Sequence, residues 1–87
     1  MSGVEWRRDP SGTGPRRRYI GRAASGMELR LTHTPNGGGG WTVWPEFTDI
    51  YVALPRGDLP DAEAQRLAVP TLVAALKAVV ERLEAAA

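Results

Sequence analysis

The stretch TLVAALKAVVERL, residues 71–83, shows the clearest periodicity in this chain. Its larger apolar residues recur at spacings of one and three positions, which places them along one side of an α-helix. They are Leu72, Val73, Leu76, Val79, Val80 and Leu83. Because such a helix must bury its apolar side against another element, the stretch predicts a C-terminal amphipathic helix that packs on the rest of the domain.

The segment just before this helix, RGDLPDAEAQRL (56–67), has the features of a helix start. Asp58 can cap the first turn, and a proline such as Pro60 is tolerated there. Pro70 has no N–H, and its ring would clash with the carbonyl four residues earlier. We therefore expect a short helix over about 60–68 and a break or kink at Pro70 before the main helix.

Upstream, the pattern changes to the two-residue period of β-strands. MELRLTHT (27–34) alternates most regularly, with Leu29 and Leu31 on one face and Arg30 on the other. In WTVWPEF, Pro45 cannot donate to a strand ladder, so we expect the strand to end there or to lie at an edge. The expected strands are VEWRR (4–8), RRRYIGRA (16–23), MELRLTHT (27–34), WTVWPEF (41–47) and TDIYVALP (48–55).

These elements predict one α+β domain over residues 1–87: an antiparallel β-meander of three to five strands with the C-terminal helix packed on one face. Residues 1–3 and 84–87 are expected to fray, and the glycine-rich PNGGGG (35–40) to form a flexible loop. Met27, Leu29, Leu31, Val43, Ile50, Val52 and Leu54 are expected to meet the helix. The opposite, open face would present Arg30, Thr32, Thr42, Trp44 and Tyr51.

Composition favours a soluble intracellular protein. The chain has no cysteine, which excludes disulfides and cysteine metal sites. The N-terminal residues lack the apolar region of a secretory signal, and no apolar run approaches the ~20 residues of a membrane span. We expect a cytoplasmic protein that does not contact the membrane.

The usual catalytic constellations are missing from the sequence. His33 is the only histidine, and no partner for a general base is indicated. The glycine run 37–40 lacks the Lys and Ser/Thr of a phosphate-binding loop. Asp58, Asp61 and Glu63 are explained by the helix start. We therefore expect no enzyme activity, no metal and no cofactor.

Basic residues concentrate in the first third of the chain. The net charge is +1, but residues 1–30 hold seven arginines and three acids. As a strand, PRRRYIGR (15–22) places Arg16, Arg18 and Arg22 on one face, where burying them unpaired would be costly. Asp9 is the only acid close to this cluster in the sequence. The pattern predicts a contact surface for a polyanion.

Two tryptophans three positions apart, Trp41 and Trp44, must face opposite sides of an extended strand. One should lie in the core, and the other should be exposed beside Tyr51, where aromatic rings suit protein interfaces and base stacking. The predicted binding residues are Arg7, Arg8, Arg16, Arg17, Arg18, Arg22, Arg30, Trp44 and Tyr51.

Two families share parts of this layout. Strands followed by YVALPRGDLPDAEAQRL (51–67), with a last strand and a helix start, resemble the single-stranded-DNA-binding transcriptional coactivators. That resemblance implies DNA binding by a dimer, but this chain lacks lysine-rich strands after residue 30. A glycine-rich turn before WTVWPEF (41–47) is similar to HicB-type antitoxins, which place a further strand after the helix. The sequence is assigned to neither family.

The functional hypothesis is a small non-enzymatic binding or regulatory module that contacts nucleic acid or another polyanion through its basic N-terminal hairpin. The alternative is a protein-binding regulator, antitoxin-like or inhibitor-like, or an assembly subunit. A basic sheet face carrying Trp44 would favour nucleic acid, whereas arginines paired with Glu5, Asp9 or Glu28 would favour a protein partner. A homodimer is expected, because the domain is small and one short meander is not expected to cover the whole helix stripe.

Overall fold

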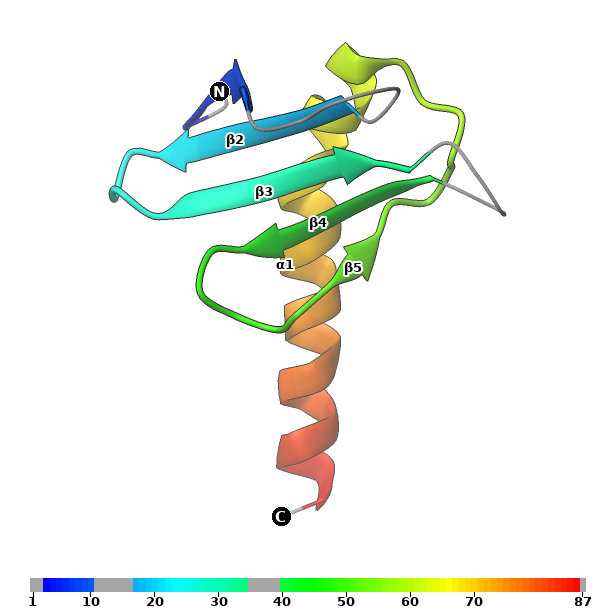
Figure 1. Ribbon diagram of the computed structural model, residues 1–87. Coiled ribbons are helices and arrows are strands. Elements are labelled where there is room, and N and C mark those ends of the chain that lie inside the picture. The colour runs from blue at the N-terminus through cyan, green and yellow to red at the C-terminus, as the bar shows by residue number, and fades with distance from the viewer. Residues whose placement is uncertain (1–2, 11–16, 35–39, 87) are drawn as a thin grey trace.

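The computed structural model describes residues 3–10, 17–34 and 40–86, so most of the predicted glycine-rich loop at 35–40 lies outside the described residues. Within these ranges the chain forms one five-stranded antiparallel sheet in the order β1-β2-β3-β4-β5 and one helix (Figure 1). The elements are β1 (Val4–Arg8), β2 (Arg17–Ala23), β3 (Glu28–His33), β4 (Trp41–Pro45), β5 (Val52–Ala53) and α1 (Asp61–Ala86). The predicted α+β meander with a C-terminal helix on one face is confirmed.

The strand register places mainly apolar residues on the face of the sheet that α1 covers and mainly polar residues on the opposite face. Tyr19, Leu31, Val43 and Val52 lie opposite one another on successive strands and share the face that α1 covers. The buried core is Leu29, Leu31, Trp41, Val43, Leu54, Leu59, Ala64, Ala68 and Leu72. On the other face Arg30 lies opposite Trp44, and Thr32 lies opposite Thr42. The alternation expected from the sequence therefore holds along β3 and β4.

Trp41 and Trp44 point to opposite faces, as predicted. Trp41 is 1% exposed and donates its indole N–H to the carbonyl of Leu59 at 2.8 Å. This bond ties the segment that enters α1 to the centre of the sheet. Pro45 is the last residue of β4, beyond the positions that pair with β5, so its missing N–H removes no bond between these two strands.

The prediction of a strand over residues 48–55 is largely wrong, because β5 contains only Val52 and Ala53. Thr48 organises a turn instead: its hydroxyl donates to the carbonyl of Pro45 at 2.9 Å and accepts from the backbone N–H of Ile50 at 3.3 Å. Side chain–backbone bonds of this kind compete with strand pairing. As a result Ile50 is exposed and does not join the core; Met27, also assigned to the core, is exposed too.

Of the break or kink expected at Pro70, the break is wrong, since α1 runs continuously from Asp61 to Ala86. Pro70 itself is exposed, while Ala68 and Leu72 on either side of it are buried against the sheet. A proline removes one helix hydrogen bond, and packing on both sides of it outweighs that loss.

The part of α1 that packs is its first half. Ala64 and Ala68 are fully buried and Leu72 is 4% exposed, whereas Val80 is 52% exposed and Leu83 is 66% exposed. Figure 1 shows the helix passing behind the sheet and continuing well past its edge. The expectation that the stripe from Leu72 to Leu83 meets the core thus holds for Leu72 and in part for Leu76, and it is wrong for Val79, Val80 and Leu83. No helix in the described part of the chain is long and apolar enough to cross a membrane.

Two contacts fix the start of α1 to β2. The hydroxyl of Tyr19 donates to Asp61 Oδ2, and Arg17 Nε lies 2.8 Å from Asp61 Oδ1. Burial, followed by the bond to Asp61, raises the pKa of Tyr19 above its ordinary value. A carboxylate in the first turn also suits the positive end of the helix dipole. The helix start is therefore held at Leu59 and Asp61.

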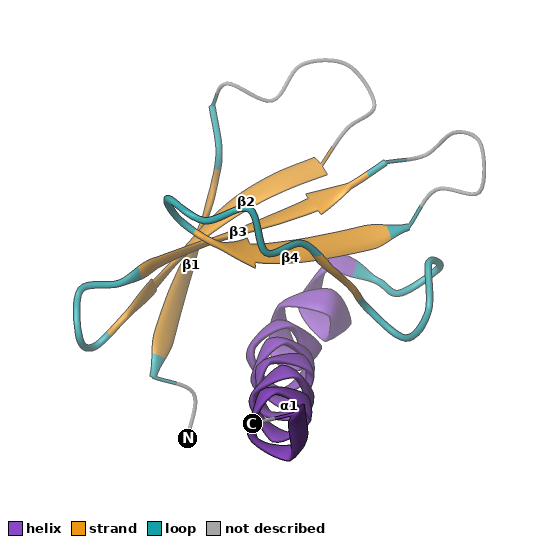
Figure 2. Ribbon diagram, turned by 90° about the horizontal axis from the view of Figure 1, so that it is seen from below, coloured by secondary structure: helices purple, strands orange, loops and turns teal. Residues whose placement is uncertain are grey.

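β1 lies against β2 through a contact that only glycine permits. A Cβ on Gly21 would stand 2.7 Å from the Trp6 ring and 2.8 Å from Val4. Without it, both side chains lie close over β2 on the face of the sheet that α1 covers. Figure 2 shows α1 beneath one part of this face, with β1 to one side of the helix.

Candidate functional site

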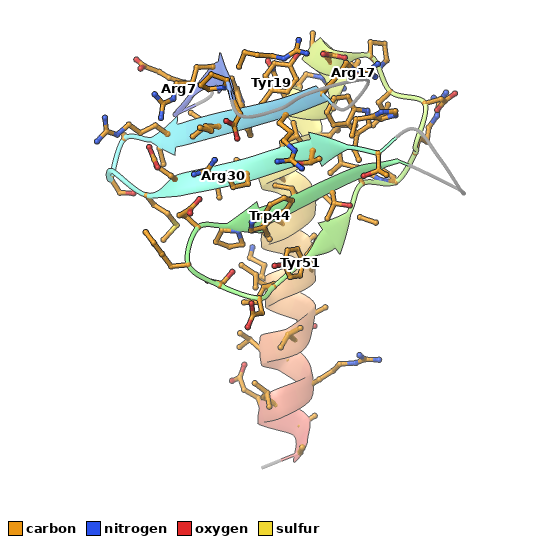
Figure 3. The ribbon with its side chains drawn as sticks, in the orientation of Figure 1. Arg7, Arg17, Tyr19, Arg30, Trp44 and Tyr51 are labelled. Carbon is orange, nitrogen blue, oxygen red and sulfur yellow. The ribbon has the colours of Figure 1, made fainter. Side chains whose placement is uncertain are left out.

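The face of the sheet opposite α1, called here the outer face, carries most of the predicted binding residues. Strand alternation places Arg7, Arg18, Arg22, Arg30 and Trp44 on it. Figure 3 shows Arg30, Trp44 and Tyr51 together on the side of the sheet that faces away from the helix. Arg18 and Arg22 share this face, as predicted, while Arg16 lies outside the described residues.

Arg30 occupies the centre of the outer face and is fully paired. Its Nη1 lies 3.1 Å from Asp9 Oδ2, and its Nε donates to Glu46 Oε2. The bond to Glu46 raises the pKa of Arg30. Asp9 is only 8% exposed, so the guanidinium compensates a buried carboxylate. This arginine joins the ends of β1 and β4 to β3, and its charge is already neutralised.

Two further arginines also meet carboxylates. Arg7 lies 3.7 Å from Glu28 in an exposed pair, and Arg17 pairs with Asp61 while its guanidinium stands 5.3 Å from the centre of the Trp41 ring. Arg17 lies on the face of the sheet that α1 covers, opposite the outer face. Residues nearby in the sequence do not cancel the charge of the arginine cluster, as predicted. Folding, however, brings acids to Arg7 and Arg17 from distant segments.

Three of the predicted binding arginines have no carboxylate within ion-pair distance among the described residues: Arg8, Arg18 and Arg22. Arg8 packs on the other face, with its guanidinium 5.6 Å from the centre of the Tyr19 ring. Arg18 has a buried Nε without a hydrogen-bond partner. Arg22 is exposed, between Glu5 and Glu28 in the strand register.

Opposite charges balance on the described outer face. Four arginines are accompanied by four acids from the same face or its edges. The bases are Arg7, Arg18, Arg22 and Arg30, and the acids are Glu5, Asp9, Glu28 and Glu46. A balanced surface does not attract polyanions over a distance as a uniformly basic one does. The described outer face is therefore mixed in charge and does not form a basic patch.

Three aromatic residues of β4 and of the segment that connects it to β5, Trp44, Phe47 and Tyr51, are called here the aromatic cluster. The Trp44 and Tyr51 rings stand 5.2 Å apart at 54°, a tilted contact typical of aromatic pairs. Tyr51 is 60% exposed, and Phe47 is 98% exposed. The neighbouring Ile50 adds a further exposed apolar side chain.

Phe47 was not among the predicted binding residues. Its backbone has a φ of 65°, in the left-handed region that non-glycine residues rarely adopt. Phe47 lies within the turn that Thr48 closes on Pro45, and its side chain is in solvent. The available signal was a large apolar residue between Pro45 and the turn-forming Thr48-Asp49, in a segment that was interpreted as strand.

Beside the aromatic cluster the outer face is hollowed into an open depression of about 520 Å³. Trp44 forms one side, and Arg18 and the paired Arg30 contribute guanidinium groups. Thr32 and Thr42 supply hydroxyls that can donate or accept hydrogen bonds. The depression can receive a polar side chain or backbone segment next to an apolar anchor point.

The described residues hold no cluster suited to metal binding, since no three His, Asp or Glu side chains gather. His33 packs on Trp41 with ring centres 4.9 Å apart, and its Nε2 lies 3.2 Å from the carbonyl oxygen of Gly57. These contacts explain His33 as a support for the loop before α1.

Comparison with known proteins gives no relative: no protein-family model matches the chain, and neither a curated protein nor a solved structure shows significant similarity to it.

Proposed function

We propose that this protein is a small non-enzymatic binding module of a regulatory or assembly kind, and that the outer face binds a protein partner. The observation that carries the proposal is Phe47, an almost fully exposed phenylalanine in a left-handed conformation. It stands in the segment of the chain that joins the contacting residues Trp44 and Tyr51. We also propose that the module is a cytoplasmic homodimer, as the sequence predicts.

The energetics of Phe47 support a binding role. The left-handed conformation costs a non-glycine residue about 1–2 kcal/mol. At 98% exposure the ring recovers almost none of this by packing within the domain. Burial of a phenylalanine against a partner is worth about 1.5–3 kcal/mol, and aromatic residues are frequent anchors of protein interfaces. Binding thus supplies the stabilisation that the isolated domain lacks.

The charge pattern also supports a protein partner. Arg30 and Arg7 pair with Asp9 and Glu28, which is the arrangement that favours a protein over nucleic acid. Mixed charges around an apolar anchor give an interface its specificity and orientation. Arg18 and Arg22, which have no ion-pair partner in the described part of the chain, are available for carboxylates of the partner.

A polyanion, including nucleic acid, is the second candidate partner. It is supported by Arg18 and Arg22 on the same face as Trp44 and Tyr51, because guanidinium groups can contact phosphates while aromatic rings stack on bases. Only these two arginines of the described outer face are without an ion pair, so this candidate ranks below a protein partner.

The test compares Phe47→Gly with Met27→Gly, a matched removal of an exposed apolar side chain from another loop. Glycine suits a φ of 65°, so Phe47→Gly should leave stability unchanged or raise it by up to about 1 kcal/mol. Proteins captured by the wild-type chain from its native host should be re-tested as purified pairs by calorimetry. Binding of a purified partner should be lost with Phe47→Gly and kept with Met27→Gly.

The competing outcome is measured on the same proteins. A mixed pool of single- and double-stranded oligonucleotides at low salt should not be retarded by the wild-type protein. Retardation that is lost in Arg18→Glu/Arg22→Glu and kept in Phe47→Gly would replace the protein partner with a polyanion. Equal partner binding by Phe47→Gly and the wild type would exclude the aromatic cluster as the anchor.

A further inference from the structure

An apolar stripe continues along α1 after the helix leaves the sheet. Its members follow one another at spacings of four, three, four and three residues, the repeat of helices that pack side by side. They are Val69, Val73, Leu76, Val80 and Leu83. Val69 and Leu76 are partly buried against the core, but Val73 is 42%, Val80 52% and Leu83 66% exposed. Nothing in the described part of the same chain covers the last two residues.

The beginning of this stripe borders a groove between α1 and β1. Val4 and Trp6 form its β1 side, and Val69 and Pro70 form its helix side. The groove has a volume of about 370 Å³ and a mainly apolar lining, with Arg66 as its charged residue. The groove exists because α1 covers only part of the face of the sheet on which it packs (Figure 2). A side chain of leucine size from another molecule can enter it.

We propose that a second copy of this chain covers both surfaces, with the two α1 helices packed antiparallel around a twofold axis near Leu76. In this arrangement Val73 meets Val80 of the other copy. Leu83 reaches the groove of the other copy beside Val69 and Trp6. Each protomer thus supplies the end of one helix and receives the end of the other, which is the self-complementary contact that a twofold axis requires.

Helix geometry supports a second copy as the occupant. Reversing the stripe about Leu76 brings Val73 opposite Val80 and Val69 opposite Leu83, so the same sequence fits both sides of the contact. The 4-3 repeat is also the one that keeps a narrow apolar seam facing a neighbouring helix. An unrelated partner would gain nothing from this internal symmetry.

Charge supports the same arrangement. Beyond Leu76, α1 carries Lys77 and Arg82 against Glu81 and Glu84, so the two helix ends have no net charge and do not repel. The antiparallel register brings Glu84 near Arg66 at the groove of the other copy. Lys77 lies at the margin of the contact near the axis, where its stem can follow the stripe with the ammonium in water.

Interface area explains why both surfaces are needed. A stable dimer buries about 800 Å² on each partner, more than a few exposed valine and leucine side chains provide. Insertion of Leu83 beside Val4 and Trp6 adds the walls of the groove on each protomer. A contact between the helix ends alone would be weak and transient.

The first experiment measures mass by sedimentation equilibrium from about 10 µM to about 500 µM, because dimerisation depends on concentration. The wild-type chain should be a dimer. Val80→Glu places a charge in the seam and should be a monomer throughout, whereas Ala78→Glu, on the opposite side of the helix, should remain a dimer. A monomeric wild type at the highest concentration, or a dimeric Val80→Glu, would overturn the proposal.

The second experiment tests the antiparallel direction. Because the chain has no native cysteine, an introduced cysteine can form a disulfide only with its copy in the other protomer. Leu76→Cys should form a disulfide-linked dimer on mild oxidation, because the two residues lie near the axis. Leu83→Cys should not, since its two copies would stand about 20 Å apart along the helices. Equal cross-linking of both variants would indicate parallel helices and reject the proposed arrangement.

Dimerisation and partner binding can fail independently. Phe47→Gly alters the outer face and should leave the dimer intact, while Val80→Glu alters only the helix seam. Loss of partner binding in the first variant with unchanged mass would leave the dimer proposal standing. A monomeric wild type that still binds its partner through Phe47 would reject the dimer alone.

Discussion

The two halves of α1 have similar apolar patterns but opposite environments. The first half buries Ala64 and Ala68 completely and is fixed to the sheet at Asp61, whereas the second half exposes Val80 and Leu83. Residues 61–73 and 74–86 each contain two leucines and two valines, so the content of larger apolar residues does not distinguish the halves. The difference teaches that position along the helix decides which part packs. Ala64 and Ala68 let the helix backbone approach the sheet closely, whereas the second half continues past the edge of the sheet (Figure 1).

The largest loss of stability should come from Trp41→Ala, which removes the buried ring that lies in the core with the first half of α1. The ring is 1% exposed and bonds to Leu59, so both packing and a hydrogen bond are lost. We expect a loss of about 3–5 kcal/mol in the free energy of unfolding, close to the whole stability of a small domain. Urea unfolding followed by circular dichroism measures it, and a loss below about 1 kcal/mol would contradict the core assignment.

A matched pair of leucines then compares the two halves directly. Leu72→Ala should reduce the free energy of unfolding by about 2–5 kcal/mol, because the side chain is 4% exposed. Leu83→Ala should change it by no more than about 0.5 kcal/mol in dilute solution, where the chain is a monomer. Equal losses in the two variants would mean that the second half is also packed within one protomer.

The importance of small residues is tested by enlarging them. Ala68→Leu inserts three carbon atoms where the structure leaves no space and should cost about 1–3 kcal/mol. Ala78→Leu, at an exposed position of the second half, should leave the unfolding midpoint nearly unchanged. If Ala68→Leu unfolds at the same urea concentration as the wild type, close helix–sheet approach is not what selects the first half.

The smallest effect concerns the bond between Tyr19 and Asp61. Tyr19→Phe should lower stability at pH 7 by about 1 kcal/mol, the usual value of a hydrogen bond. The pKa of Tyr19 is raised in the folded state, so its contribution is complete below pH 10 and is lost as pH rises further. The stability difference between wild type and variant should therefore shrink above pH 10. A difference that is constant from pH 7 to pH 11 would contradict this role.

Local patterns in the sequence predicted much of the fold. Alternation in residues 27–34 and 41–47 assigned the two faces of the sheet, including the opposite orientations of Trp41 and Trp44. These patterns depend only on strand geometry, which neighbouring residues determine. The packing half of α1 could not be predicted in this way, because alanine is a weak hydrophobic signal and its value here comes from the distance it permits.

The candidate site depended more on tertiary structure. The arginine cluster was visible in the sequence, but Asp61 and Glu46, which neutralise Arg17 and Arg30, come from segments far along the chain. Such pairs cannot be derived from local charge counts. Phe47 escaped notice because a two-residue β5 and a turn set by Thr48 replaced the expected strand. Because of these tertiary contacts, the expected basic patch is a surface of mixed charge. The exposed apolar residue is Phe47, which was not predicted.

The order of the strands in the sheet has a consequence for how the chain folds. Each strand pairs with the one before it in the sequence, so every pairing step closes a short loop. Short loops lose little chain entropy, and topologies rich in them fold quickly. During synthesis the hairpins can form as soon as their second strands emerge, before α1 has been made. The strands can therefore pair before α1, which follows them in the sequence, is available to cover the sheet.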